Sequence, residues 1–335
     1  MKAKIESLAD VYSLVESDIS DIDARISKLL SQAENSATYE MCQHILKAGG
    51  KRIRPILSLL TVLMINPHVR SLPSYSDKVL TIATAVELIH MASLVHDDVI
   101  DNSSIRRNQP SVNAQFGNSK AVTLGVYLYS MSLAEIAKAQ SIDCLRLLSA
   151  AVKGMCLGEL NQLDLRKDGD FTWNSYLNII KSKTADLFRA ACQCGSVIIE
   201  ATDEQQAAIK RFGHNLGMLF QLTDDYLDYF SDGSSLKKAV GQDYLDTQVT
   251  LPILLYMDGL DSDDSQRFVS DFKNKVWNFE SLKKCLLDAE VDKKSEAYIE
   301  KLKLDSLQEL SIFEDNSYRD ALFGIVEIIS QRIFS

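Results

Sequence analysis

The sequence predicts an all-α protein, folded as a bundle of helices. Apolar residues recur at spacings of three and four along nearly the whole chain, and alternating strand patterns of any length are hard to find. Only 14 Gly and 5 Pro residues interrupt 335 positions, of which 46% are hydrophobic. We therefore expect one helical domain over residues 1–335, with a more polar C-terminal third from about residue 257.

The composition narrows the possible partners and the location. The net charge of −10 and a pI near 5.1 argue against nucleic-acid binding, which needs a clustered basic surface. The N-terminal stretch 1–30 is rich in acids and lacks the apolar run of a signal peptide, so we expect a cytoplasmic protein. No window approaches 18 uncharged apolar residues, which predicts at most peripheral membrane contact. The six cysteines show no CxxC or zinc spacing and are expected to be free, buried thiols.

Loop signals divide the chain into its helices. Polar residues, Gly and Pro gather in five short stretches, none long or simple enough to link separate domains. The predicted loops are 70–77, 106–120, 166–172, 230–235 and 257–266.

Two of the expected helices, 81–95 and 213–223, are apolar on nearly every side, which is typical of helices buried inside a bundle. Each runs directly into an Asp-Asp-x-x-Asp cluster at its C-terminal end, where the helix dipole disfavours carboxylates. The two clusters are Asp97, Asp98 and Asp101, and Asp224, Asp225 and Asp228.

The spacing within each cluster favours a metal. Residues i and i+4 share a helix face, so Asp97 pairs with Asp101 and Asp224 with Asp228. Mg²⁺ prefers carboxylate oxygen and commonly bridges one or two carboxylates to substrate phosphates. The alternative is a solvated acidic surface, the usual fate of a charge run, but it does not explain two such clusters on buried helices.

Basic residues suited to phosphate accompany the acids. Arginine forks match phosphate oxygens, and paired cations can hold a diphosphate, although each basic residue alone is more often part of a solvated surface. The basic candidates are Lys51, Arg52, Arg54, Arg106, Arg107, Lys183, Lys237 and Lys238, and Thr184 supplies a neutral hydroxyl beside Lys183.

The motifs GGKRIRP (49–55), LVHDDVID followed by RR, KTADLF (183–188) and FQLTDDYLD (220–228) resemble those of the all-trans polyprenyl diphosphate synthases. The resemblance covers about residues 40–255, in the order and spacing of that family. The neighbouring sequence segments are most similar to the larger, catalytic component of two-component heptaprenyl or hexaprenyl synthases. These segments are VELIHMASLVHDDVID and MCLGELNQ.

The resemblance implies an isoprenoid synthase fold with a deep central cavity and two acid clusters facing each other across its mouth. It implies about three Mg²⁺ on an allylic diphosphate, held by Asp97, Asp98, Asp101, Asp224, Asp225 and Asp228. It places Arg106, Lys183, Thr184, Gln221 and Lys238 on the same diphosphate, and Lys51, Arg54, His90 and Arg107 on isopentenyl diphosphate. The catalytic set is Asp97, Asp98, Asp101, Lys183, Asp224 and Asp225.

The implied reaction needs no protein nucleophile, because the allylic C–O bond ionises and the double bond of isopentenyl diphosphate attacks the cation. The resemblance implies that bulk below the first cluster sets the product length. Ala92 and Ser93 precede this cluster by about one turn and are small. The resemblance therefore implies an all-trans product of about C30 to C40, which we expect to serve quinone side chains. The candidates for the floor of the tail channel are Met91, Tyr127, Tyr129 and Met131.

Several alternatives stay open. The product could be shorter, as in geranylgeranyl or farnesyl synthases, or the chain could be a non-catalytic subunit of a heteromeric synthase, although such subunits typically lose their aspartates. A terpene cyclase shares the first motif but usually carries N-D-x-x-S-x-x-x-E, which is absent here. We expect either a homodimer or a heterodimer with a smaller subunit.

Individual residues also carry alternatives. Glu87-x-x-His90 matches half of a di-iron site, but no second half is present, and His90 could be an ordinary core histidine. His96 is expected to be structural. The chain departs from the family pattern at Asn108, Val126 and Gln248, which puts substrate affinity in question more than the reaction type.

Overall fold

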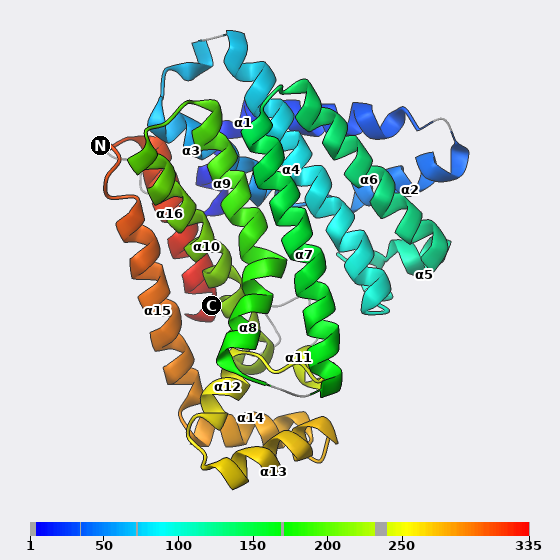
Figure 1. The fold of residues 1–335 in the computed structure, drawn as a ribbon, viewed down its shortest axis with the longest axis vertical. Coiled ribbons are helices and arrows are strands. Elements are labelled where there is room, and N and C mark those ends of the chain that lie inside the picture. Colours follow the sequence, from blue (N-terminus) through cyan, green and yellow to red (C-terminus); the bar gives the residue numbers. More distant parts are fainter. Residues whose placement is uncertain (1–4, 34, 72, 169–170, 232–239, 335) are drawn as a thin grey trace. The chain divides into compact units, whose positions relative to one another are not determined.

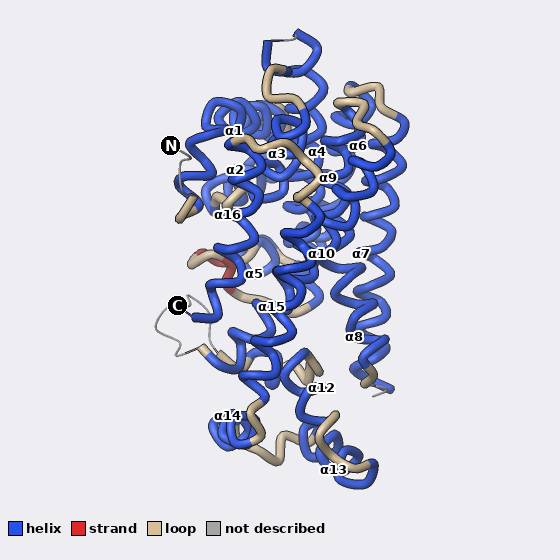
Figure 2. Tube along the Cα trace, turned by 90° about the vertical axis from the view of Figure 1, so that its left-hand side faces the viewer, coloured by secondary structure: helices blue, strands red, loops and turns tan. Residues whose placement is uncertain are grey.

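The structure is a computed structural model, and it describes residues 5–33, 35–71, 73–168, 171–231 and 240–334. Figures 1 and 2 show that helices make up nearly all of the described chain. The α-helices are α1 (Leu8–Ser31), α2 (Ser36–Ala48), α3 (Ile53–Ile65), α4 (Pro73–Ile100), α5 (Val112–Phe116), α6 (Asn118–Lys138), α7 (Ile142–Asp168), α8 (Trp173–Ile180), α9 (Asp186–Ile198), α10 (Asp203–Phe230), α11 (Gln242–Leu245), α12 (Leu251–Met257), α13 (Ser262–Lys273), α14 (Phe279–Asp288), α15 (Val291–Glu309) and α16 (Ser317–Gln331). Shorter elements are η1 (Val69–Ser71), η2 (Lys181–Ala185), η3 (Arg332–Phe334) and the strands β1 (Ile105–Arg106) and β2 (Gln109–Pro110). The predicted all-α class is confirmed.

The chain divides into two compact units, and the expectation of one domain over residues 1–335 stays a prediction. Unit 1 comprises Met1–Val152, Ala190–Lys210 and Phe313–Leu322. Unit 2 comprises Lys153–Arg189, Arg211–Ile312 and Phe323–Ser335. The first acid cluster belongs to unit 1 and the second to unit 2, so each is described within its own unit.

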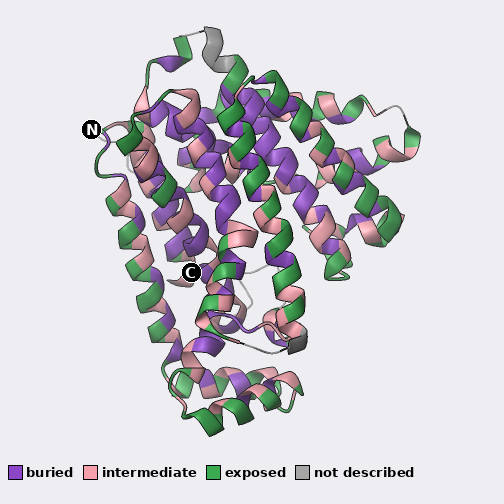
Figure 3. Ribbon diagram, in the orientation of Figure 1, coloured by how far each residue is buried: buried purple, intermediate pink, exposed green. Residues whose placement is uncertain are grey.

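Helix α4 is the central element of unit 1 and packs against α1, α3 and α6. Its residues from Val79 to Ala92 are buried almost without interruption, apart from His90 (Figure 3). The predicted loop 70–77 is wrong from Pro73 onward, because proline is tolerated in the first turn of a helix, where its missing N–H is not needed. The segment Asp77–Ile100 is also long and apolar enough to cross a membrane, contrary to expectation, but 83% of its most apolar window is buried inside the protein.

The predicted loop 106–120 contains more structure than expected. β1 and β2 pair antiparallel, with Ile105 opposite Pro110 and Arg106 opposite Gln109, and α5 and the start of α6 follow. The two turn residues, Arg107 and Asn108, both have positive φ angles of 52° and 61°. A two-residue hairpin turn of this kind favours asparagine, because its short polar side chain tolerates the left-handed conformation.

Unit 2 contains the second half of α10, which carries the second acid cluster in its last two turns. A π-helical turn, η2, joins α8 to α9 and contains Lys183 and Thr184. Gly217 allows α10 to approach this turn, because a Cβ there would lie 2.5 Å from the Cα of Ala185. The predicted loop 257–266 is shorter in the structure, since Asp261 caps α13 and the helix starts at Ser262.

All six cysteines are free, as predicted. Four are buried, but Cys156 is exposed and Cys285 is half-buried, so the prediction of burial is wrong for these two.

Candidate active site

The first acid cluster occupies the end of α4. Asp101 follows the last residue of the helix, yet its N–H donates to the carbonyl of Asp97 at 2.8 Å, so the two residues remain one helical turn apart. Asp98 is 2% exposed and accepts hydrogen bonds from one edge of the Arg106 guanidinium, with Nε 2.7 Å from each carboxylate oxygen and Nη2 2.6 Å from Oδ1. Burial raises the pKa of Asp98, and the Arg106 charge opposes that rise.

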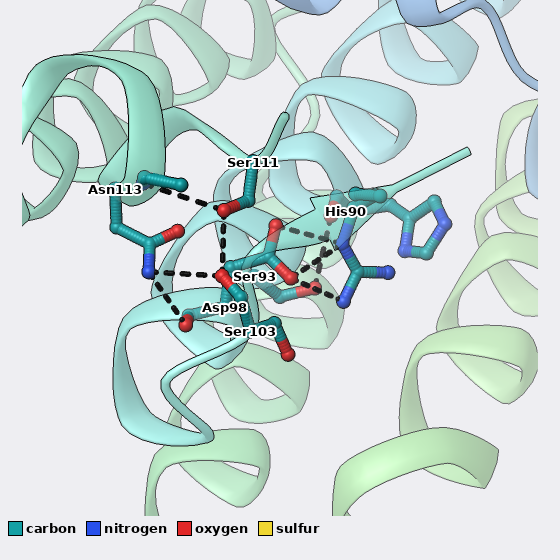
Figure 4. Close-up of polar contacts among 8 residues, drawn as sticks. His90, Ser93, Asp98, Ser103, Ser111 and Asn113 are labelled. Atoms are coloured by element: carbon teal, nitrogen blue, oxygen red, sulfur yellow. Dashed lines mark hydrogen bonds and ion pairs between the residues drawn. The ribbon is translucent and has the colours of Figure 1, made fainter. Parts of the chain in front are cut away.

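The segment after this cluster is fixed by polar contacts (Figure 4). Asn113 Nδ2 donates to the carbonyls of Asp98 and Ser103 at 3.1 Å each, and Ser111 Oγ donates to the carbonyl of Ser103 at 2.6 Å. These bonds hold the end of α4 against the start of α5, and the hairpin between them carries Arg106 and Arg107.

Cations gather next to the first cluster in unit 1. Burial lowers the pKa of Arg54 and of Arg107, while the charge of Glu87 opposes both shifts, and both guanidiniums stay charged at neutral pH. Burial, followed by the charges of Arg54 and Arg107, lowers the pKa of His90 well below its usual value. A neutral imidazole can still donate one hydrogen bond to a phosphate oxygen. Three of the four residues predicted to hold isopentenyl diphosphate therefore lie together, and the fourth, Lys51, is exposed on the adjoining loop.

The di-iron alternative does not fit this environment. Glu87 Oε1 accepts a hydrogen bond from Arg52 Nη1 at 2.8 Å, and no cluster of metal-binding side chains surrounds it among the described residues. His96 is structural in character, as expected, because its Nε2 lies 3.0 Å from the carbonyl oxygen of Val122 and its ring packs on Tyr129.

Each aspartate of the second cluster has a different partner. Asp224 Oδ1 lies 2.7 Å from Arg332 Nη1. Asp225 is 4% exposed and accepts hydrogen bonds from the Tyr176 hydroxyl at 2.5 Å and from Gln221 Nε2 at 2.8 Å. Asp228 Oδ2 accepts the backbone N–H of Asp243 at 2.9 Å. Burial raises the pKa of Asp225 to about 7, since its two hydrogen-bond donors are neutral and only partly oppose the effect.

A cavity within unit 2 is lined by the predicted diphosphate ligands Lys183, Thr184 and Gln221 together with Asp225. Thr184 Oγ1 donates to Gln221 Oε1 at 2.8 Å, and Lys183 pairs with both Glu159 and Gln162. Gln162 Nε2 in turn donates to Gln248 Oε1 at 2.8 Å. Lys237 and Lys238, the remaining predicted cations, lie outside the described residues.

Only some of the tail-channel candidates lie in the core of unit 1. Ala92 is fully buried, and Ser93, also buried, donates its hydroxyl to the carbonyl of His90 at 2.9 Å. Met91 is buried and lines a second cavity, which also touches Asp98, Arg106 and Arg107. The other three candidates are half-buried and do not line this cavity: Tyr127, Tyr129 and Met131.

The donor chemistry of both clusters fits a hard divalent cation, since every predicted ligand is a carboxylate. In the part of the chain that the structure describes, no three His, Cys, Asp or Glu side chains are already arranged around a common point. Mg²⁺ commonly takes one or two carboxylates from a protein and its other ligands from water and substrate phosphates. The residues that would hold it are Asp97, Asp98, Asp101, Asp224, Asp225 and Asp228.

Sequence reasoning missed several members of these networks. Tyr176 lies seven residues before Lys183, which is two helical turns, and this spacing could have placed both on one face. Glu159 and Gln162 lie in the quoted segment MCLGELNQ but were assigned no role. Arg332 carries no local signal, since it is far from Asp224 in the sequence.

Known proteins share both the sequence pattern and the fold. The family model described as polyprenyl synthetase matches residues 35–288. Octaprenyl diphosphate synthase of Escherichia coli is 31% identical, over 97% of this chain and 99% of its own length. Heptaprenyl diphosphate synthase component 2 of Geobacillus stearothermophilus is 36% identical, over 74% of this chain and 75% of its own.

The solved structures agree. The polyprenyl synthase of Caulobacter crescentus, crystallised with calcium and isoprenyl diphosphate, superimposes with a TM-score of 0.87 at 26% identity, covering 98% of each chain. The decaprenyl diphosphate synthase of Rhodobacter capsulatus gives a TM-score of 0.89 at 25% identity, covering 98% of this chain and 99% of its own. The all-α fold of the isoprenoid synthases, expected from the motifs, is thereby confirmed. The family model and these relatives show that the chain belongs to the polyprenyl synthetase family, an enzyme family of prenyltransferases.

Proposed function

We propose that the protein is a Mg²⁺-dependent prenyltransferase that condenses isopentenyl diphosphate with an allylic diphosphate, farnesyl or geranyl diphosphate. The observation that carries this proposal is the repeated association of acids with diphosphate-binding groups. In unit 1, Asp97, Asp98 and Asp101 lie beside Arg54, His90, Arg106 and Arg107, and in unit 2, Asp225 shares a cavity with Lys183, Thr184 and Gln221. No other reaction suggested by the sequence uses all of these groups.

The residues of the second cavity suit an allylic diphosphate. Lys183 supplies a cation, and Thr184 and Gln221 supply neutral hydrogen bonds to phosphate oxygens. Magnesium ions, about three per site, would neutralise charge that develops on the departing diphosphate. Since this leaving group carries its negative charge away from carbon, fixed cations and donors here lower the barrier to ionisation.

The residues of unit 1 suit the second substrate. Lys51, Arg54 and Arg107 would bind the diphosphate of isopentenyl diphosphate, with His90 as a neutral donor. The double bond of isopentenyl diphosphate attacks the allylic cation, and a new C–C bond forms. A proton then leaves the adjacent carbon, and the released diphosphate accepts it. The protein must hold the two carbons in line and exclude water, which would otherwise trap the cation. This requires the two acid clusters to face one shared cavity.

The product we propose is an all-trans chain of about C30 to C40, used for quinone side chains. Small residues at Ala92 and Ser93 leave room for a long tail beside α4. The relatives include octaprenyl, heptaprenyl and nonaprenyl synthases, although geranylgeranyl and short-chain synthases are similar too. A single large substitution, Ala92→Phe, should shorten the product, because an aromatic ring there would block the channel.

The proposed assembly is a dimer in the cytoplasm, either of two copies or with a smaller subunit. Val122, Val126 and Leu133 lie four and seven residues apart on α6, so they form one exposed apolar stripe, and Val126 is 57% exposed. An uncharged residue at Val126 extends this stripe. Heptaprenyl synthase component 2 is named as one component of an assembly, which supports testing a smaller partner.

The decisive assay mixes the purified protein with farnesyl diphosphate, isopentenyl diphosphate and Mg²⁺, with and without a candidate small subunit, and reads product masses. We expect a ladder that ends at about C30 to C40. Products ending at C20 would favour the short-chain alternative. No elongation under either condition would favour a non-catalytic subunit and contradict the proposal.

A further inference from the structure

Arg52 stands between the two cations that are proposed to hold isopentenyl diphosphate, Lys51 and Arg54. Its backbone is left-handed, with φ 45° and ψ 30°, at the residue that precedes α3. A residue other than glycine reaches this conformation at a cost of about 1–2 kcal/mol. Such strain persists only where the surroundings impose it.

Two acids from two different helices hold Arg52 in this left-handed conformation. Arg52 Nε donates to Asp23 of α1 at 2.7 Å, and Nη1 donates to Glu87 of α4 at 2.8 Å. Burial works against the charged form of Arg52, yet Glu87 and Asp23 outweigh it and raise the pKa. The rigid guanidinium fork therefore ties the loop before α3 to both helices within unit 1.

Glu87 also attracts the other two arginines of this site, Arg54 and Arg107. It is 2% exposed, and its second oxygen, Oε2, is buried with no hydrogen-bond partner among the described residues. The attraction of Glu87 opposes the depressed pKa values of both Arg54 and Arg107. One buried carboxylate thus offsets the repulsion among three guanidiniums before any anion is present.

The loop is packed closely around this arrangement. A Cβ on Gly50 would lie 2.8 Å from Arg52 Nη1 and 2.9 Å from Arg107 Nη1, so a side chain at this position would displace both guanidiniums from the loop. The hydroxyl of Tyr12 on α1 donates to the carbonyl of Lys51. The backbone that carries Lys51 and Arg54 is consequently held from several sides.

We propose that Glu87, Arg52 and Asp23 are positioning residues that fix Lys51 and Arg54 in the geometry that binds the diphosphate of isopentenyl diphosphate. The identity of that ligand rests on the proposed function. The anchoring of the loop does not rest on the proposed function, because it should affect the affinity of this loop for any diphosphate. None of the three residues needs to touch the substrate.

The kinetic test separates positioning from general stability. Glu87→Gln keeps the shape but removes the charge, and it should raise the KM for isopentenyl diphosphate about tenfold, since a misplaced binding group can cost up to about a hundredfold. The KM for the allylic diphosphate and kcat should change less than about twofold, because Glu87, Arg52 and Asp23 are not among the proposed ligands of that diphosphate. Equal changes for both substrates, or no change, would overturn the proposal.

A binding test avoids the reaction altogether. Calorimetry with inorganic diphosphate, without Mg²⁺, should show about tenfold weaker binding to Glu87→Gln than to the wild type. The loss should largely disappear when both proteins carry Lys51→Ala, because the two changes then act through the same contact. Fully additive losses would show that Glu87 does not act through Lys51.

Two further variants keep this test sound. Asp77→Asn is the matched control, because Asp77 of α4 pairs with Arg25 of α1 away from the loop, and it should leave diphosphate binding unchanged. If Glu87→Gln fails to fold, Asp23→Asn replaces it, since the Asp23 side chain is 47% exposed and about threefold weaker binding is expected. Unchanged binding in Asp23→Asn would then overturn the proposal. A wild type that binds diphosphate but makes no product would contradict the proposed function alone.

Discussion

The two acid clusters share one sequence pattern but differ in how each neutralises its buried member. Asp98 in unit 1 is buried against a guanidinium that contacts both of its oxygens, so its charge is paired. Asp225 in unit 2 is buried against a tyrosine hydroxyl and a glutamine amide, and among the described residues no cation contacts it directly. Identical DDxxD spacing therefore specifies the position of the carboxylates, whereas their protonation is set by the different groups that surround each buried member.

A functional consequence follows from this difference. In the first cluster, burial raises the pKa of Asp98 and the charge of Arg106 opposes that rise. The second cluster holds one carboxyl whose pKa is about 7, so binding a metal there would displace a proton from part of the population. Metal binding in unit 2 should accordingly be the more sensitive of the two to pH.

The largest expected effect removes one carboxylate from either cluster. Asp97→Ala and Asp224→Ala should each lower kcat by about 10²–10³-fold, because each removes charge that stabilises the bound diphosphate and its metals. Steady-state elongation assays measure this loss, with circular dichroism as a check on folding. Asp263→Ala, at an exposed acid in α13, is the control and should keep full activity. A loss confined to one cluster would break the proposed equivalence of the two.

Removing the cation from the first cluster should be the next largest effect. Arg106→Gln leaves Asp98 buried without its charge partner and should lower the free energy of unfolding by about 2–3 kcal/mol at pH 7, measured by urea denaturation. Arg146→Gln breaks the exposed Arg146–Asp143 pair and should cost less than about 0.5 kcal/mol. Equal costs for the two variants would contradict the assigned role of the Arg106 pair.

Removing the charge of Asp225 from the second cluster should raise the free energy of unfolding, whereas removing the charge of Arg106 should lower it. The folded protein holds the proton of Asp225 more tightly than the unfolded chain, so the stability contributed by this proton is complete at low pH and is lost as the pH rises toward about 7. Without metal, Asp225→Asn should therefore be more stable than the wild type by about 1–2 kcal/mol at pH 8, and the gain should vanish near pH 4. A gain independent of pH would rule out this explanation.

The smallest effect concerns the turn that carries the arginines of the first cluster. Asn108 has φ 61°, which asparagine and glycine tolerate better than other residues. Asn108→Ala should lower the free energy of unfolding by about 1 kcal/mol, and Asn108→Gly should change it by less than half of that. A thermal melt of the two variants distinguishes them, and identical melting temperatures would contradict a strained turn.

The sequence predicts the helices and the acid clusters because both depend on local information. Apolar periodicity marks α4 and α10, and the i, i+4 spacing is enough to place Asp97 with Asp101. Exact boundaries are less predictable: Pro73 marks a turn as readily as a first helical residue, and the hairpin at Arg107 and Asn108 depends on two positive φ angles.

The partners of the buried groups could not be predicted. The bonds from Tyr176 to Asp225, from Arg332 to Asp224 and from Arg52 to Glu87 join residues distant in the sequence, and no local pattern distinguishes them from ordinary surface residues. The surroundings of Val126 and Gln248, which depart from the family pattern, are also visible only in the structure. Val126 extends an apolar stripe, and Gln248 accepts a hydrogen bond from Gln162 in the chain of contacts that reaches Lys183.

The central claim is that both acid clusters act on one diphosphate. A crystal structure of the protein with Mg²⁺ and inorganic diphosphate tests it most directly. We predict magnesium ions that contact carboxylates from both 97–101 and 224–228 and share oxygens of the same diphosphate. Metal bound at only one cluster, or two clusters with separate diphosphates, would contradict the account.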